Sequence, residues 1–359
     1  MKILVIGPFP EPMFGVSLSN MVLTKGLIAK GFEVRTINTS TSTTISSSHG
    51  DWSFKKLSFL KYYLQLFKVI SSDVIYCTTG QTFFGILKYA PFLLLAKVLN
   101  RKTIVHVKGG YLKISYENMN NLKKTISKRV LKLYKKGIVL SESLKPLLEE
   151  FLGPEKIFIQ HNFIQQSLIL SEKEVFKRKD FEGIRIVFLS NLIPEKGIYQ
   201  LLDALDELNS NGIEFEAKIA GHIPNNQQGI IERMYKIKNL EFIGVVRDSA
   251  KADLLSWGNV FCLPTYYSME GQPISILEAM GFGNVIVTTK HAGIPDVCTD
   301  KNGLFVEKRD VESLVNELNY LTKNTVWVEE TCRFNLIQAR KLYSEEAFVN
   351  GVIKIMKSK

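Results

Sequence analysis

Two glutamates, Glu270 and Glu278, flank a proline in a stretch whose spacing suggests chemistry. The preceding apolar residues, 259–264, end in a proline and are typical of a buried strand. Pro273 suits the first position of a helix, where its missing N–H costs nothing, so Glu278 would lie about one and a half turns into that helix. The free N–H groups of the first turn and the positive end of the helix dipole would then point between the two carboxylates. Such an arrangement suits a ligand with an anionic centre and hydroxyls at both ends, as in a nucleotide-diphosphate sugar.

The same stretch continues with Glu-Ala-Met and Gly-Phe-Gly, ending at Gly283. The order of a strand, a proline, Glu-Gly-x-Pro, Glu-Ala-Met and Gly-x-Gly resembles the signature of retaining glycosyltransferases with two Rossmann domains, the GT-B type. Members of that family make bacterial surface polysaccharides, lipid-linked sugars and sucrose-related products. The resemblance implies that Glu278 binds the ribose hydroxyls of a nucleotide and that Glu270 faces the transferred sugar. The alternative interpretation is a solvated helix with two unrelated surface glutamates.

A second motif, Ser-Asn-Leu-Ile-Pro-Glu-Lys-Gly at residues 190–197, lies between an expected strand and an expected helix. A lysine beside a helix N-terminus can clamp a phosphate. The motif resembles the family pattern Gly-Arg-Leu-x-x-Glu-Lys-Gly, whose Arg and Lys bind the diphosphate. This sequence keeps Lys196 but has Asn191 in place of the Arg, and an amide brings no charge. Diphosphate binding would then depend on Lys196 and the helix end, or on another cation such as Arg247. Further donor contacts are expected from Gly271, Gln272 and Ile274.

The first residues show a Rossmann-type opening: a strand at 2–7, a loop containing Gly15, and a helix at 18–30. Gly15 could let the backbone approach a phosphate, although a glycine in a loop can simply make a turn. In the resembling family a glycine at this place lies close to the donor diphosphate. Farther along, His106 ends an expected strand in the sequence His-Val-Lys-Gly-Gly.

The resembling enzymes place a histidine near the donor sugar, and a related pattern is His-x-His-Gly-Gly. Because Lys108 stands where that pattern has its second histidine, both His106 and Lys108 are candidates to face the sugar. A structural hydrogen bond is the alternative role for His106. The other histidines form no ligand cluster, and no Asp-x-Asp occurs. We therefore expect no metal and no cofactor, and a mechanism based on Lys196 and helix dipoles.

Apolar strands alternate with helices along the chain, which predicts an α/β protein with two doubly wound parallel sheets facing across a cleft. We expect a basic, acceptor-side domain at 1–166, a linker at 167–182, a donor domain at 183–340, and a C-terminal helix at 341–359 that could pack back on the first domain. Strands are expected at 2–7, 33–37, 73–77, 103–107, 137–140, 184–189, 214–220, 240–244, 260–263, 285–288 and 303–306. A Ser/Thr-rich loop is expected at 39–50, and helices at 57–70, 121–136, 144–151, 197–208 and 329–356.

The charge is distributed unevenly over the 359 residues, whose formal net charge is +11. Residues 1–180 hold 27 Lys and Arg against 12 Asp and Glu, whereas residues 181–359 hold 19 against 23. Residues 55–136 alone hold 17 basic and 2 acidic side chains. This asymmetry indicates a polyanionic partner, and we favour an anionic membrane surface over nucleic acid. The alternative is a solubilising face in a lysine-rich protein.

No export signal or membrane span is expected. The first apolar run is stopped by Pro8, and the apolar segment 83–99 is short and contains Lys88, Pro91 and Lys97. The four cysteines have no metal-binding spacing, which fits a reducing compartment. These features indicate a cytoplasmic protein that is peripheral on the inner face of the membrane.

Taken with the resemblance, the sequence implies a hexosyltransferase of bacterial surface-polysaccharide synthesis (capsule, O-antigen or lipopolysaccharide). The donor would be a UDP- or GDP-sugar, and the acceptor a glycan or polyprenyl-linked glycan. In the family's usual description the leaving phosphate takes the acceptor's proton, so no separate base is required. A sugar-nucleotide epimerase on the same fold and a non-catalytic nucleotide-sugar or glycan binder remain as alternatives, and a nucleic-acid binder is disfavoured.

Overall fold

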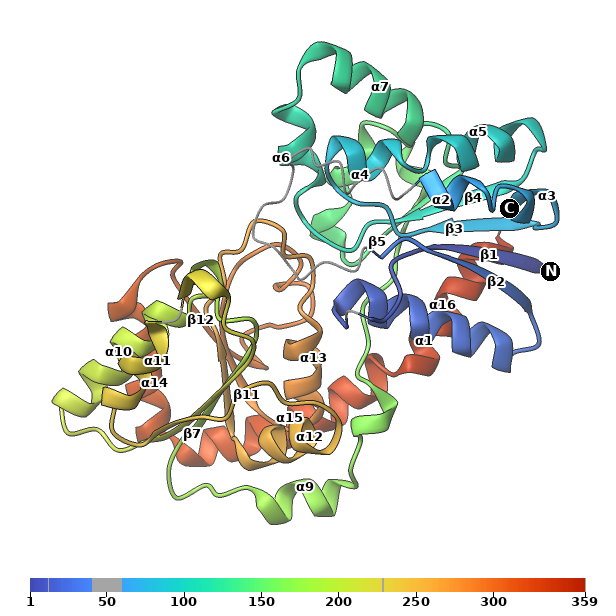
Figure 1. Cartoon of the computed structure of the whole chain (residues 1–359). Coiled ribbons are helices and arrows are strands. Elements are labelled where there is room, and N and C mark those ends of the chain that lie inside the picture. Colours follow the sequence, from blue (N-terminus) through green and yellow to red (C-terminus); the bar gives the residue numbers. More distant parts are fainter. Residues whose placement is uncertain (12, 41–59, 228, 359) are drawn as a thin grey trace. The chain divides into compact units, whose positions relative to one another are not determined.

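The computed structural model describes residues 1–11, 13–40, 60–227 and 229–358. The chain divides into two compact units, which Figure 1 shows in sequence colours. The first unit comprises Met1–Asn162 together with Glu345–Lys359, and the second comprises Phe163–Ser344. Each unit is built on a parallel sheet of six strands. The prediction of two Rossmann-like α/β domains is confirmed.

The sheet of the first unit has the strand order β2-β1-β3-β4-β5-β6. Every residue of β3 and β5 is buried, as expected for central strands of a parallel sheet that is covered on both faces. The strands are β1 (Lys2–Gly7), β2 (Glu33–Asn38), β3 (Val74–Cys77), β4 (Lys102–His106), β5 (Lys136–Val139) and β6 (Ile157–Ile159). The helices are α1 (Gly15–Ala29), α2 (Leu60–Tyr63), α3 (Phe67–Ile70), α4 (Phe83–Leu87), α5 (Ala90–Val98), α6 (Leu112–Glu117), α7 (Asn121–Leu131), α8 (Pro146–Glu149) and α16 (Glu345–Lys357).

Several helices of this unit differ from their expected bounds. Helix α1 begins earlier than residue 18, because Ser17 Oγ accepts a hydrogen bond from Phe14 N at 2.9 Å and stabilises the first turn. Residues 60–70, expected to lie in one helix, form two short helices separated by a turn, while residues 57–59 lie outside the described residues. The loop expected at 39–50 also lies outside them from residue 41 onward.

Two more expected helices are shorter or broken. Helix α7 ends at Leu131, and Lys136 instead opens β5. The Lys136 ammonium donates to the carbonyl oxygens of Ile355 at 3.0 Å and Ser358 at 2.5 Å, so it caps the C-terminus of α16. The region 329–356 is not one helix: it breaks between α15 and α16, where Tyr343 O accepts a hydrogen bond from Ile164 N.

The sheet of the second unit has the order β12-β11-β10-β7-β8-β9, which read from the other edge is the dinucleotide-binding order. All strands are parallel, but the order in which the chain adds strands reverses between β7 and β10, which lie side by side. The strands are β7 (Arg185–Leu189), β8 (Glu216–Ala220), β9 (Leu240–Phe242), β10 (Val260–Leu263), β11 (Val285–Thr289) and β12 (Gly303–Val306). The helices are α9 (Glu172–Arg178), α10 (Ile198–Ser210), α11 (Ile230–Lys236), α12 (Asp248–Trp257), α13 (Ile274–Gly281), α14 (Val311–Lys323) and α15 (Thr325–Leu342).

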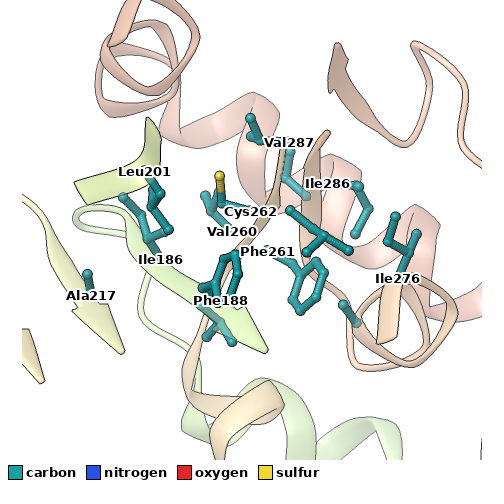
Figure 2. Packing of buried hydrophobic residues seen from close by; sticks show 14 of the residues in the cluster. Ile186, Phe188, Leu201, Ala217, Val260, Phe261, Cys262, Ile276, Ile286 and Val287 are labelled. Carbon is teal, nitrogen blue, oxygen red and sulfur yellow. The ribbon is translucent and has the colours of Figure 1, made fainter. Parts of the chain in front are cut away.

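The core of this unit lies around the three strands β7, β10 and β11 (Figure 2). Phe188, Phe261 and Val287 are fully buried there, and α13 adds Ile276. Cys262 is buried among them as a small apolar side chain, and its burial raises the pKa of the thiol. The packed strands give a rigid base for the loops that follow β7 and β10.

Candidate functional site

The two loops at the reversal of strand order in the second sheet bring Lys196 and Glu270 together. Lys196 follows β7, Glu270 follows β10, and their Nζ and Oε2 atoms lie 2.5 Å apart. The side chains are only 13% and 9% exposed. Ligands of open α/β sheets bind outside the carboxyl ends of the strands at such a switch point. The structure thus joins two candidates that the sequence separates by 74 residues.

Close backbone packing fixes this contact. Gly197 has a φ of +81°, and a Cβ placed on it would lie 2.4 Å from the carbonyl oxygen of Pro264. A glycine is therefore needed here both for the left-handed conformation and for the approach of the two loops. The backbone N–H of Tyr266 donates to Glu195 O at 2.8 Å, which ties the β10 loop to the β7 loop.

Three residues that the sequence analysis did not single out surround the pair. Thr265 Oγ1 lies 3.3 Å from Glu270 Oε2, and the Lys196 ammonium lies 5.0 Å from the ring centre of Tyr267. His291, after β11, places Nε2 at 2.8 Å from Tyr267 O, and burial lowers the pKa of this imidazole. No sequence signal marked these residues beyond their positions after strands.

Residues 271–274 connect Glu270 to α13. Pro273 occupies the N-cap rather than the first helical position, so the helix begins one residue later than expected, at Ile274. The N–H groups of Ile274 and Ser275 have no acceptor within the helix, whereas the N–H of Ile276 donates to Pro273 O at 3.2 Å. Gly271 O accepts from Gly293 N at 2.8 Å, and Gln272 is buried. The loop is therefore held in place directly before a helix N-terminus.

Glu278 lies on α13 and makes a second buried ion pair. Its Oε1 lies 2.7 Å from Nζ of Lys251 on α12, and the two side chains are 2% and 15% exposed. Lys251 also donates to Gln165 Oε1 at 2.9 Å. Burial raises the pKa of the Glu278 carboxyl, and the Lys251 charge opposes that rise. The sequence analysis missed Lys251 and Gln165, and expected Glu278 to bind the ribose hydroxyls of a nucleotide.

The two other candidates for binding the donor diphosphate, Asn191 and Arg247, do not take part in either ion pair among the described residues. Asn191 is half-buried directly after β7, where its carbonyl accepts from Ile193 N at 2.9 Å. Arg247 is the exposed N-cap of α12, and its carbonyl accepts from the backbone N–H of Lys251. Among the described residues, no ion pair joins Arg247 to Glu270 or Glu278. Arg247 is thus one helical turn from Lys251 but is not part of a clamp.

The candidates of the first unit lie at carboxyl ends of its own strands. Gly15 is the exposed first residue of α1, after β1. His106 ends β4, is fully buried, and accepts or donates through Nδ1 to the Tyr76 hydroxyl at 2.6 Å. Its Nε2 has no hydrogen-bond partner among the described residues. Burial, with a smaller effect of Lys108, holds the pKa of His106 well below its usual value, so the ring is neutral.

Lys108 lies next to that histidine. Its ammonium donates to Asn162 Oδ1 at 3.2 Å and lies 4.7 Å from the ring centre of Phe348 on α16. Burial lowers the pKa of this lysine well below its usual value. The structure therefore gathers the candidates into two groups, one in each unit. Glu270 and Lys196 touch each other, as do Glu278 and Lys251, and His106 and Lys108 are neighbours.

No three His, Cys, Asp or Glu side chains gather as a metal ion would require among the described residues. Within the described ranges, no helix is long and apolar enough to cross a bilayer.

Comparison with known proteins shows a family match in the second unit. Residues 183–324 match the family described as "Glycosyl transferases group 1". The putative colanic acid biosynthesis glycosyltransferase WcaL of Escherichia coli K12 is 29% identical over 142 residues, which cover 38% of this chain and 35% of that protein. The amylovoran biosynthesis glycosyltransferase AmsK of Erwinia amylovora is 26% identical over 157 residues, 40% of this chain and 37% of that protein. The matched region thus spans about a third of these relatives.

Solved structures resemble the entire chain. Anabaena HepE in complex with UDP and glucose superposes with a TM-score of 0.74 at 14% identity, and WaaG, a glycosyltransferase involved in lipopolysaccharide biosynthesis, with 0.69 at 12%. Both alignments cover 100% of each chain. At such low identity the likeness concerns the fold. This chain therefore has the GT-B fold, and its residues 183–324 match the model of the glycosyl transferases group 1 family.

Proposed function

We propose that this chain is a hexosyltransferase that takes a sugar from a nucleotide-diphosphate sugar and transfers it, with retention, to a glycan or polyprenyl-linked acceptor. The observation that carries the proposal is the contact between Lys196 and Glu270 at the switch point of the second sheet, directly before the N-terminus of α13. A cation and a carboxylate touch there, four residues before the N–H groups of Ile274 and Ser275 at the start of α13, and these groups suit a phosphate and a sugar.

In this proposal each group has a separate role. Lys196 and the start of α13 hold the diphosphate and stabilise the negative charge that develops on the leaving β-phosphate. Glu270 accepts from hydroxyls of the transferred sugar, and Glu278 from the ribose. The leaving phosphate takes the proton of the acceptor hydroxyl, so the step uses no metal and no separate base. Secondary donor contacts are proposed for Asn191, Gly271, Gln272 and Ile274, and, from the first unit, for Gly15, His106 and Lys108.

The relatives suggest which substrates to test. HepE was solved with UDP and with UDP-glucose, so a UDP-sugar is the first donor to try and a GDP-sugar the second. The names of WcaL and AmsK refer to colanic acid and amylovoran, which supports a surface polysaccharide as the product. We place the protein in the cytoplasm, on the inner face of the membrane, because its first unit is strongly basic.

Calorimetry with UDP, GDP and ADP, followed by turnover of the matching sugars, tests the proposal. Lys196→Met should raise the Kd of the preferred nucleotide about tenfold or more, because a hydrogen bond to a charged group contributes about 1.5–3 kcal/mol. Lys236→Met, at an exposed lysine of α11, is the control. Glu270→Gln should lose turnover and keep nucleotide affinity.

Unchanged affinity in Lys196→Met or unchanged turnover in Glu270→Gln contradicts the assigned roles. Donor consumption that does not need an acceptor would identify an epimerase instead. Tight nucleotide binding without turnover on any acceptor would indicate a non-catalytic partner.

A further inference from the structure

The first unit carries a row of exposed apolar side chains on adjacent short helices. Leu64, Phe67 and Ile70 follow one another at intervals of three residues, Leu64 in the turn after α2 and the other two on α3. Leu94 and Val98 lie one turn apart on α5. Their exposed fractions lie between 54% and 82%. Because α3 and α5 pack against each other, the five side chains belong to one surface, which we call the α3–α5 surface. Soluble proteins expose single apolar residues commonly, but adjoining groups of them mark an interaction site.

Lysines flank these apolar side chains. Lys61 precedes Leu64 by the same interval of three, and Lys97 adjoins Val98; both lysines are exposed. Neither takes part in an ion pair among the described residues. Arg101, which follows α5, donates to Ile70 O at the end of α3 at 2.7 Å and so joins the two helices. The α3–α5 surface thus combines apolar side chains with cations that have no acidic partner in the part of the chain that the structure describes.

Not every basic residue of this region belongs to the surface. Lys68 turns back to its own unit, where its ammonium donates to Thr36 O at 2.9 Å and to Gln65 Oε1 at 2.6 Å. Asp73, one of the two acidic residues between 55 and 136, accepts from the backbone N–H of Lys2 at 2.8 Å. Lys68 and Asp73 are therefore engaged within their own unit and do not contribute to the α3–α5 surface.

We infer that the α3–α5 surface docks on an anionic lipid bilayer. Interfacial helices bind membranes by placing Leu, Phe and Val among the acyl chains and Lys at the phosphates, which is the arrangement found here. Nucleic acid fits less well, because it is held mainly through polar and basic contacts to phosphates and through aromatic stacking. Three of the five apolar side chains at this surface are Leu or Val, which supply none of these contacts. The inference rests on the membrane location given under the proposed function and names the surface that provides it; its test measures vesicle binding alone and does not depend on the transfer reaction.

Co-sedimentation of the full chain with vesicles tests the inference. Binding should be weak to phosphatidylcholine vesicles and strong when phosphatidylglycerol is added, and it should fall as salt rises. The apolar variant Leu64→Ser/Phe67→Ser/Val98→Ser and the charge variant Lys61→Glu/Lys97→Glu should each lower the partition coefficient at least tenfold. All five positions are exposed or on short surface helices, so thermal unfolding should change little.

Two matched controls separate this surface from general effects. Ile28→Ser changes an exposed apolar residue of α1, which lies beside α16 and away from α5 in the first unit (Figure 1). Lys236→Glu reverses a charge in the second unit. Both should bind vesicles as the unmodified chain does. Absence of binding to anionic vesicles at low salt, or equal loss in controls and variants, overturns the inference. It is equally overturned if the variants lose only binding to single-stranded RNA, or only self-association, while vesicle binding persists.

Discussion

Replacing Lys251 with Met tests the second ion pair most directly. The Glu278 side chain is only 2% exposed, so loss of its cation leaves a carboxylate without a counter-charge in the protein interior. Breaking a buried pair in this way costs about 3–5 kcal/mol. The cost has an upper limit, because the carboxyl can take up a proton instead. From an ordinary pKa of 4.5, protonation at about pH 7.5 costs about 4 kcal/mol.

This limit makes the effect depend on pH in a defined direction. Burial already raises the pKa of folded Glu278 above its unfolded value, and removing Lys251 raises it further. The folded variant therefore binds a proton that the unfolded chain lacks, and its stability is lost as pH rises through the folded pKa. The penalty relative to the unmodified chain should be about 3–4 kcal/mol near pH 7.5 and only about 1–2 kcal/mol near pH 5.5, since protonation becomes about 1.4 kcal/mol easier per pH unit.

Thermal unfolding at the two pH values measures both parts of the expectation. For a unit of this size, about 2–4 °C of Tm per kcal/mol predicts a fall of about 6–16 °C near pH 7.5. Lys236→Met is the control, and the double variant Lys251→Met/Glu278→Gln should recover most of the loss because it leaves no charge unpaired. The reasoning is refuted by an equal fall at both pH values, by a fall no larger than in Lys236→Met, or by losses that simply add in the double variant.

Two further predictions concern single positions with close matched controls. Lys136→Met should free the C-terminus of α16 and cost about 1–3 kcal/mol, seen as faster amide exchange in α16, because the ammonium bonds the carbonyls of Ile355 and Ser358. Lys135→Met, next to it, loses only an exposed bond to Asn100 and should leave exchange in α16 unchanged. Gly197→Ala should weaken nucleotide binding and lower Tm, because its Cβ would lie 2.4 Å from Pro264 O. Gly212 has a similar φ of +69°, but a Cβ placed on it would have no atom within 4 Å, so Gly212→Ala should show only the effect of backbone strain. If both variants weaken nucleotide binding equally, the proposed clash at Gly197 is contradicted.

The sequence predicted elements better than it predicted side-chain partners. The strands expected at 260–263 and 303–306 have those bounds in the structure, because short apolar runs closed by Pro, Gly or a charge have few alternatives in an α/β chain. The short helices α2 and α3 were not separated, since periodicity over 57–70 fits one helix as well as two. The adjacency of Lys196 and Glu270 follows from the strand order seen in the structure, because both residues follow strands that meet at a switch point.

The pairs that the sequence did not reveal depend on how helices lie against each other. Lys251 meets Glu278 across 27 residues and Gln165 across 86, through the positions of α12 and α13 over the sheet. In the same way His106 meets Tyr76 from a neighbouring strand. Such contacts depend on how helices and strands pack in space, and the spacing of these elements along the chain does not determine that packing. No local sequence motif could therefore have indicated the contacts.

The two pairs also change how the missing arginine at position 191 is understood. With Asn191 there, the described cations in contact with the two glutamates are Lys196 and Lys251, one for each carboxylate. These four charges sum to zero, so they give no net attraction for a diphosphate. If the proposed donor binds, positive potential must come from the unpaired N–H groups at the start of α13 and from Lys196 turning from Glu270 to phosphate. Glu270 would then lose its partner as the donor arrives, and would be free to accept from the sugar hydroxyls. Phosphate binding and the availability of Glu270 are therefore linked in this site. An arginine at position 191 could bind the phosphate without taking Lys196 away from Glu270, so the two events would then be separate.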